Sequence, residues 1–430
     1  MKIFRIALIG VLGLLVTPLM AQSEEPTFTL QEAYQKIKKN YPSAEKIEIR
    51  QKIAGFNQQL NQSNWLPNII VGASTSYQSD VTEVPFAAPG TSSPGFSKDY
   101  YSISIDVNQS IFDGGRVGAL KKIENSNEKA SLAMVDVELQ NVRAQIDGLF
   151  FGIILLKKQQ ESLSLMANDI AEQLKLVQSR VNNGVLLPGN ELVLKAELLK
   201  LEQQQLELKS SVKSGYEALG LILDTDFKNQ PDLSYPDLEE LDTLNEASIH
   251  RAELELFKAK STMLEESKGL LKADKLPTLS AFAKSAYARP GLNAFDDDMQ
   301  LYWMVGLKAQ WSFRNWHNAS KKNEVLLLEQ RSIEVEENAF TLQLEASLTQ
   351  SLERIRSLEK QIELDKNIVE LRKQVVSEKK SLLEHGVITS TEWLTELNAE
   401  HRAKLNLEVH QTELVKTNIE YLTKKGIVWN

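Results

Sequence analysis

Residues 131–181 read SLAMVDVELQNVRAQIDGLFFGIILLKKQQESLSLMANDIAEQLKLVQSRV, and this stretch decides the fold. Its apolar side chains recur at alternating spacings of three and four, which is the heptad pattern of a helix packed along another helix. The series is interrupted only by Gln160 and runs through Leu132, Val135, Leu139, Val142, Ile146, Leu149, Ile153, Leu156, Leu163, Ala167, Ile170, Leu174, Val177 and Val181. We therefore predict one helix over about 117–183, roughly 100 Å long at ~1.5 Å per residue. Such a helix has to pack beside other long helices.

Three further segments carry apolar stripes at helical spacing and contain no internal proline. We predict helices over about 320–384, 191–223 and 391–424. The four helices pair as two antiparallel hairpins, because their turns contain Gly184-Val185 and Gly386-Val387. Glycine is the residue that tolerates the left-handed conformation at a helix C-terminus.

The landmarks of the first half recur in the same order in the second half. Leu66-Pro67 returns as Leu276-Pro277, Phe112 returns as Phe313, and the first hairpin turn returns as the second. This order predicts an internal duplication, with a first repeat over 22–240 and a second over 241–430.

Each predicted repeat also contains two segments that alternate apolar and polar residues. We predict strands over about 68–78, 100–112, 278–288 and 300–313. Runs of about ten residues with this period fit the strands of outer-membrane barrels, and they also fit a half-buried sheet lying on the helices. Four strands cannot close a membrane barrel, which needs about eight. If these are membrane strands, several chains must therefore share one barrel, and three copies give twelve strands.

The beginning of the chain is typical of an exported protein. Lys2 and Arg5 precede an apolar run from Ile6 to Met20, so we predict a signal peptide over residues 1–21, with an uncleaved anchor as the alternative. No other apolar stretch is long enough for a transmembrane helix.

The composition argues against an enzyme and against several kinds of site. The chain has no cysteine and only five histidines, so thiolate zinc sites and cysteine nucleophiles are excluded. Its formal charge of −9 disfavours a nucleic-acid partner. We predict no catalytic residues, no metal and no cofactor. Gly114-Gly115 lacks the spacing and the lysine of a phosphate-binding loop, so we interpret it as a turn.

Across its whole predicted mature length the sequence resembles the TolC family of outer-membrane channels. The resemblance rests on the duplicated order of helices and strands, on the two Leu-Pro pairs, and on the hairpin tips. Its most specific local match is the strand-to-helix turn Gln109-Ser110-Ile111-Phe112-Asp113-Gly114-Gly115-Arg116. The second half departs from it at Phe313-Arg314-Asn315-Trp316, where both glycines are absent.

The resemblance implies a mainly helical protein whose four strands join those of two other copies. The homotrimer would have a twelve-stranded barrel in the outer-membrane lipid of a Gram-negative bacterium and a barrel of helices across the periplasm. It would be a passive exit duct of a tripartite efflux or type I secretion system, with a periplasmic adaptor and an inner-membrane pump as partners. Residues 29–40 and 224–249 would form an equatorial belt, and 79–99 and 288–300 extracellular loops. The alternatives are an adaptor-like protein and a structural coiled coil.

The resemblance also implies functional residues near the hairpin tips. Gly184, Val185, Gly386 and Val387 would contact the adaptor. The family's periplasmic gate has acidic residues shortly after the tip glycines, at positions that correspond here to Glu392 and Thr395 in the second half and to Asn190 and Glu191 in the first. Because acidic residues are also favoured in the first turn of a helix, Glu392 is either a gate residue or only a helix cap.

Overall fold

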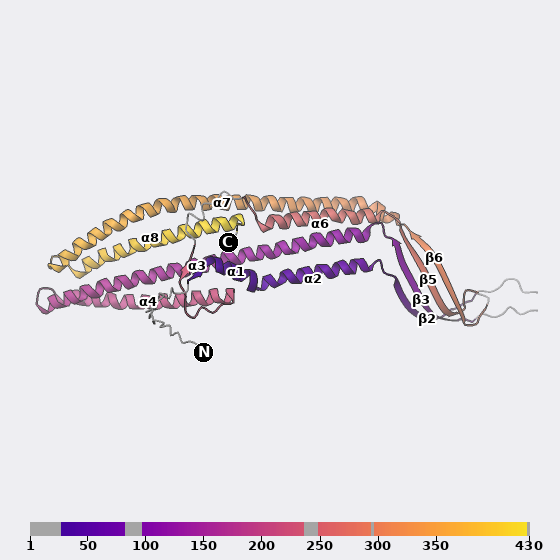
Figure 1. The fold of residues 1–430 in the computed structure, drawn as a ribbon, viewed down its shortest axis with the longest axis horizontal. Helices are drawn as coiled ribbons and strands as arrows, with labels where there is room; N and C mark the ends of the chain where they lie inside the picture. Colours follow the sequence, from indigo (N-terminus) through magenta and orange to yellow (C-terminus); the bar gives the residue numbers. More distant parts are fainter. Residues whose placement is uncertain (1–26, 82–96, 236–247, 294–295, 428–430) are drawn as a thin grey trace, which may run out of the picture.

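The computed structural model describes residues 27–81, 97–235, 248–293 and 296–427. Two helices dominate it: α3 (Arg116–Asn182), with 67 residues, and α7 (Phe313–Glu384), with 72. The molecule is elongated, with a sheet at one end and two hairpin turns at the other (Figure 1). The predicted signal peptide lies outside the described residues, as do most of the predicted loop 79–99 and part of the predicted belt.

Shorter helices accompany the two long ones in two tiers. In the tier near the turns, α4 (Pro188–Leu223) packs on α3, and α8 (Ser390–Lys425) packs on α7. The two hairpins meet where α3 contacts α8. In the tier near the sheet, α2 (Pro42–Ser63) packs on α3, and α6 (Ala252–Asp274) lies between α3 and α7. Each tier is thus a layer of four helices with α7 at one edge and α4 or α2 at the other.

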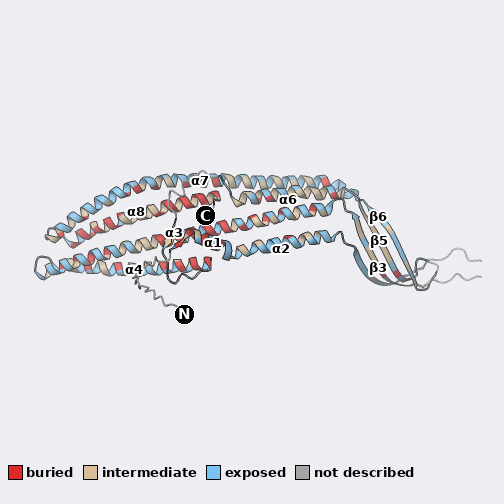
Figure 2. Ribbon diagram, viewed as in Figure 1, coloured by how far each residue is buried: buried red, intermediate tan, exposed pale blue. Residues whose placement is uncertain are grey.

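The main core lies where the two tiers meet. Phe150, Phe151 and Ile146 of α3 are fully buried there against α4 and α8. The short helix α1 (Leu30–Asn40) closes this core with Tyr34 and Ile37, and a parallel pair of two-residue strands, β1 (Phe28–Thr29) and β4 (Leu233–Ser234), lies beside it. Figure 2 shows buried residues concentrated along the middle of α3 and along α8, whereas α2 is mostly exposed and the strands contain few buried residues.

The sheet is antiparallel, with the order β2-β3-β5-β6. Its strands are β2 (Asn68–Tyr77), β3 (Asp99–Phe112), β5 (Thr278–Arg289) and β6 (Gln300–Gln310). The register pairs Val71 with Ile105, Val107 with Ala283, and Ala283 with Val305. Because facing residues share one side of a sheet, the predicted alternation becomes one continuous apolar face across four strands. β2 and β6 are its unpaired edges.

The structure confirms the predicted class of long helical hairpins with four strands, and it corrects one boundary. The strand predicted to end at 313 ends at Gln310, and the helix predicted to begin at 320 begins at Phe313. Trp311 leaves the ladder and donates its indole N–H to the carbonyl of Lys275 at 3.0 Å, and its ring stacks on Trp316. These contacts turn the chain. Trp311 and Phe313, which continue the alternation of the predicted strand, therefore belong to the turn and to the start of α7.

Candidate functional site at the hairpin tips

The two hairpin turns have the same local geometry. Gly184 and Gly386 have φ values of 73° and 74°, in the left-handed region that glycine occupies without strain. The N–H groups of Val185 and Val387, which follow them, bond back to carbonyls five residues earlier, both at 2.9 Å. This is the glycine-terminated helix end expected from the sequence. Both valine side chains are exposed at the extreme end of the molecule.

The structure brings the two tips into direct contact. The backbone N–H of Ser390, at the start of α8, donates to Oδ1 of Asn190, near the start of α4, at 2.8 Å. A β-carbon built on Gly386 would lie 3.9 Å from side-chain atoms of Val185 and Leu186. Asn190 therefore links one hairpin to the other across 200 residues of sequence.

Beneath the turns, one apolar cluster holds both hairpins together. It contains residues of all four helices, and its largest member, Trp393 of α8, is 2% exposed. Leu194 of α4 and Leu383 of α7 are fully buried in the same cluster. Sequence reasoning did not single out Trp393, although a tryptophan in the first turn of an amphipathic helix is a signal that could have found it.

Glu392 caps its own helix. Its Oε2 accepts hydrogen bonds from the backbone N–H and the hydroxyl of Thr389, at 2.8 and 3.0 Å, and its own N–H donates to that hydroxyl at 3.3 Å. This reciprocal pattern is a capping box. The backbone N–H of Thr389, followed by its hydroxyl, lowers the pKa of Glu392, so the exposed carboxylate stays charged near neutral pH. The capping role is established, and a capping carboxylate that faces solvent can also serve in a gate.

The other two predicted gate residues have local partners. Glu191 accepts from Lys195 at 2.7 Å and from Gln178 at 3.2 Å. Thr395 donates its hydroxyl to the carbonyl of Thr391 at 2.9 Å, within its own helix. Neither of them is hydrogen-bonded or ion-paired to Glu392.

The predicted strand-to-helix turn lies at the opposite end of the helices, against the end of α6. Asp113 accepts from the N–H groups of Gly115 and Val117, both at 2.8 Å, and Arg116 pairs with Asp274 at 2.9 Å. A β-carbon on Gly114, whose φ is 71°, would lie 2.8 Å from the carbonyl oxygen of Ala273. The joint between sheet and helices is therefore held by contacts of Asp113, Gly114, Gly115 and Arg116, directly after Phe112, the last residue of the strand.

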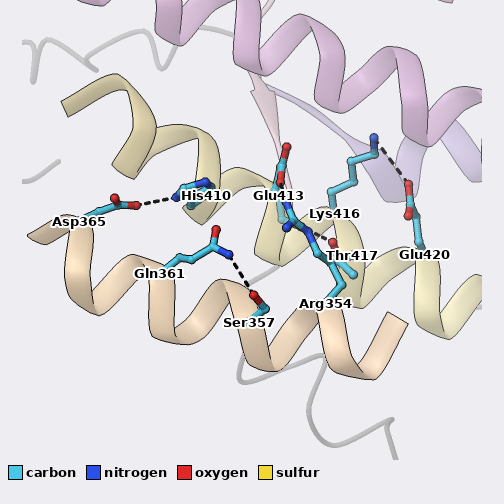
Figure 3. A network of polar contacts seen from close by, with 9 residues as sticks. All are labelled: Arg354, Ser357, Gln361, Asp365, His410, Glu413, Lys416, Thr417 and Glu420. Atoms are coloured by element: carbon cyan, nitrogen blue, oxygen red, sulfur yellow. Dashed lines mark hydrogen bonds and ion pairs between the residues drawn. The ribbon is translucent and has the colours of Figure 1, made fainter. Parts of the chain in front are cut away.

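Polar contacts cross the second hairpin beside a small apolar cluster of Leu358, Ile362 and Leu414 (Figure 3). His410 of α8 lies 2.5 Å from the carboxylate of Asp365 of α7, and Arg354 of α7 reaches Glu413 of α8, also at 2.5 Å. These pairs were missed in the sequence because their partners are distant along the chain. Within the described residues, no group of three or more His, Asp or Glu side chains is placed to hold a metal ion. None of the helices in that part of the chain is both long and apolar enough to cross a membrane.

Comparisons with known proteins agree with this geometry. Residues 33–224 match the sequence model of the outer membrane efflux protein family. No curated protein sequence matches at a significant level. Among solved structures, the outer membrane protein VceC of Vibrio cholerae superposes with a TM-score of 0.71 at 15% identity, covering 93% of this chain and 97% of VceC. CusC gives 0.73 at 13% identity, covering 94% and 93%. The Campylobacter jejuni CmeC outer membrane channel gives 0.69 at 14% identity, covering 92% and 85%.

Proposed function

Because the chain has the fold of TolC-like outer-membrane channels and its residues 33–224 match the outer membrane efflux protein family, we propose that it is the exit duct of a tripartite efflux system. Three copies would form a passive conduit that is anchored in the outer membrane and extends into the periplasm. A periplasmic adaptor and an inner-membrane pump would deliver the cargo. The sheet is the strongest support for the proposal. In one chain it has one apolar face and two unpaired edge strands, so it needs strands of other copies to close.

The edges of the sheet suit closure with further copies. β2 and β6 are separated by two strands in a fully antiparallel order, so they run in opposite directions. β6 of one copy can therefore pair with β2 of the next and continue the antiparallel ladder. Open strand edges are not tolerated in lipid, and three copies give the twelve strands that exceed the minimum of about eight.

The edge helices of the two tiers lie on the same sides of the molecule as the edge strands of the sheet. β2 continues from α2, and α7 continues from β6, so the copy that pairs its β2 with β6 of a neighbour also brings α2 and α4 towards that neighbour's α7. All three helices carry exposed apolar stripes at helical spacing: Ile49, Ile53, Phe56 and Leu60 on α2; Leu192, Leu199 and Leu206 on α4; and Val325, Leu328, Val335, Leu342, Leu364 and Leu371 on α7. Such stripes are expected to be covered in an assembly.

The tips fit the gate and the adaptor contact. In a threefold assembly, Glu392 would lie close to its two symmetry mates, where three carboxylates repel one another and attract cations. Val185 and Val387, exposed at the turns, would contact the adaptor. The direct Asn190–Ser390 bond supports the gate, because it holds the two hairpins of one copy together at this end.

The assembly can be tested on the full chain purified in detergent. We expect the mass of three copies by native mass spectrometry, an elongated threefold particle by electron microscopy, and ion-conducting channels in planar lipid bilayers. A monomer that is soluble without detergent and does not conduct would refute the proposal. For the adaptor, a photo-crosslinking residue at position 387 should give adducts with a periplasmic adaptor in cells, whereas the same probe at position 328, in the α7 stripe, should give adducts between copies.

A further inference from the structure

A cleft opens where the two tiers of helices meet. It lies between α1, the middle of α3 and the first turn of α6, and has a volume of about 430 Å³. Small-molecule sites have volumes of roughly 300–1,000 Å³, so the cleft can accept a ligand of about dipeptide size. It is distant from the hairpin tips and from the sheet, so the proposed gate and the proposed barrel do not use it.

The floor of the cleft contains two buried polar side chains, each with one buried atom that has no hydrogen-bond partner. Gln140 and Arg143, three residues apart on α3, line the cleft, and each is 9% exposed. Neither Oε1 of Gln140 nor Nε of Arg143 has a hydrogen-bond partner. The guanidinium carbon of Arg143 lies 5.8 Å from the centroid of the Tyr34 ring, which attracts the cation but provides no acceptor. A buried guanidinium is stabilised fully only by an acceptor in its plane.

The rim of the cleft carries charges of both signs. Lys38 of α1, Asp136 of α3 and Glu255 of α6 line it and are exposed. None of these three forms an ion pair at contact distance with a described residue, although Lys38 and Arg143 act on Asp136 through the electrostatic field. Arg251 also lines the cleft, but it is bonded to both carboxylate oxygens of Glu253 and is therefore already neutralised.

We propose that this cleft binds a small zwitterion of about dipeptide size, with its carboxylate on Arg143 and Gln140 and its ammonium group towards Asp136 and Glu255. A guanidinium presents a planar pair of N–H groups that matches a carboxylate, and the amide of Gln140 can turn its NH₂ to the same group. The rim carries two carboxylates against the one ammonium group of Lys38, so its net negative charge disfavours a simple anion. A simple cation would be repelled by the arginine at the floor. Only a ligand with both charges satisfies floor and rim together.

The probe for this site is L-alanyl-L-alanine, added to the full chain in detergent and followed by ligand-observed saturation-transfer NMR. We expect saturable binding of the dipeptide. We expect at least tenfold weaker binding of N-acetyl-L-alanyl-L-alanine, which lacks the ammonium group, and of L-alanyl-L-alanine amide, which lacks the carboxylate. Lys175→Gln, an exposed substitution on α3 far along the helix from the cleft, is the matched control and should bind as the wild type does.

Two substitutions test the assigned orientation. Glu255→Gln, at the exposed rim, should weaken binding of the dipeptide but strengthen that of the acetylated analogue, whose anion Glu255 repels. Arg143→Gln should weaken binding of the dipeptide but strengthen that of the amide, whose cation Arg143 repels. Absence of saturable dipeptide binding to the wild type would overturn the proposal, and so would equal dipeptide affinities of the wild type and Glu255→Gln, a variant whose exposed position keeps the fold. Trimer mass and channel conductance are measured separately, so failure here is distinguishable from failure of the proposed duct.

Discussion

In the proposed channel, removing the bond between the two hairpin tips should favour the open state. Asn190→Ala removes the acceptor of the 2.8 Å hydrogen bond from the Ser390 N–H. A half-buried bond of this kind stabilises its state by about 1 kcal/mol. If three copies close as one unit, the closed state loses about 3 kcal/mol, which shifts the ratio of open to closed channels about 150-fold.

Single-channel recording in planar bilayers measures this shift as the fraction of time spent at high conductance. Ser390→Ala is the matched control, because it keeps the backbone N–H and removes only a buried hydroxyl that has no partner. Ser390→Pro removes the donor instead, at the first position of a helix, where proline is tolerated. The double variant Asn190→Ala/Ser390→Pro should open no more than either single variant, because all three lack the same bond. Equal open fractions for Asn190→Ala, Ser390→Ala and the wild type would refute the reasoning.

Three further predictions concern single side chains. Glu392→Gln keeps a capping side chain and loses the charge, so thermal unfolding should be nearly unchanged while the cation preference of the proposed channel falls. Unchanged ion selectivity would leave Glu392 as a cap only. Burial raises the pKa of Asp147, which accepts from the Tyr34 hydroxyl, to about 7. Because the folded state then holds this proton more tightly than the unfolded state, stability from this group is present at acidic pH and is lost as the pH rises towards 7. Asp147→Asn should therefore be more stable than the wild type at pH 8 in denaturant titrations, with a smaller difference at pH 5; a variant less stable at both would contradict this cause. Gly114→Ala should destabilise by at least about 1 kcal/mol, because the added carbon meets the carbonyl of Ala273 and the backbone has a positive φ, whereas Gly118→Ala, with open space around it, should not.

Helices and tips were predictable because their signals are local. The heptad series of 131–181 lies within α3, and the predicted limits 117–183 differ from the observed ones by one residue at each end. The glycines at the tips adopt the conformation for which the sequence singled them out. The end of the fourth strand was not predictable, because Trp311 continues the alternation and leaves the ladder only through its bond to Lys275, which is distant in sequence.

The candidate site also has features that the sequence could predict and features that it could not. The capping role of Glu392 follows from Thr389 three residues before it, and the sequence left that role open beside the gate. The link from Asn190 to Ser390, and the burial of Trp393 between the hairpins, depend on how α4 and α8 meet. The gate and the adaptor contact stay predictions.

The sequence by itself determined the periodic elements of this protein and the order in which they repeat, because spacing along one chain fixes which side chains share a face of a helix or strand. The tertiary structure alone decided which faces meet. Packing α4 against α8 created the tip contact, and packing α1 against α3 created the buried Tyr34–Asp147 pair. The strand register merged four separate alternations into one apolar face. These features arise between residues that are far apart in sequence, and their energies depend on distance in space, which spacing along the chain does not record.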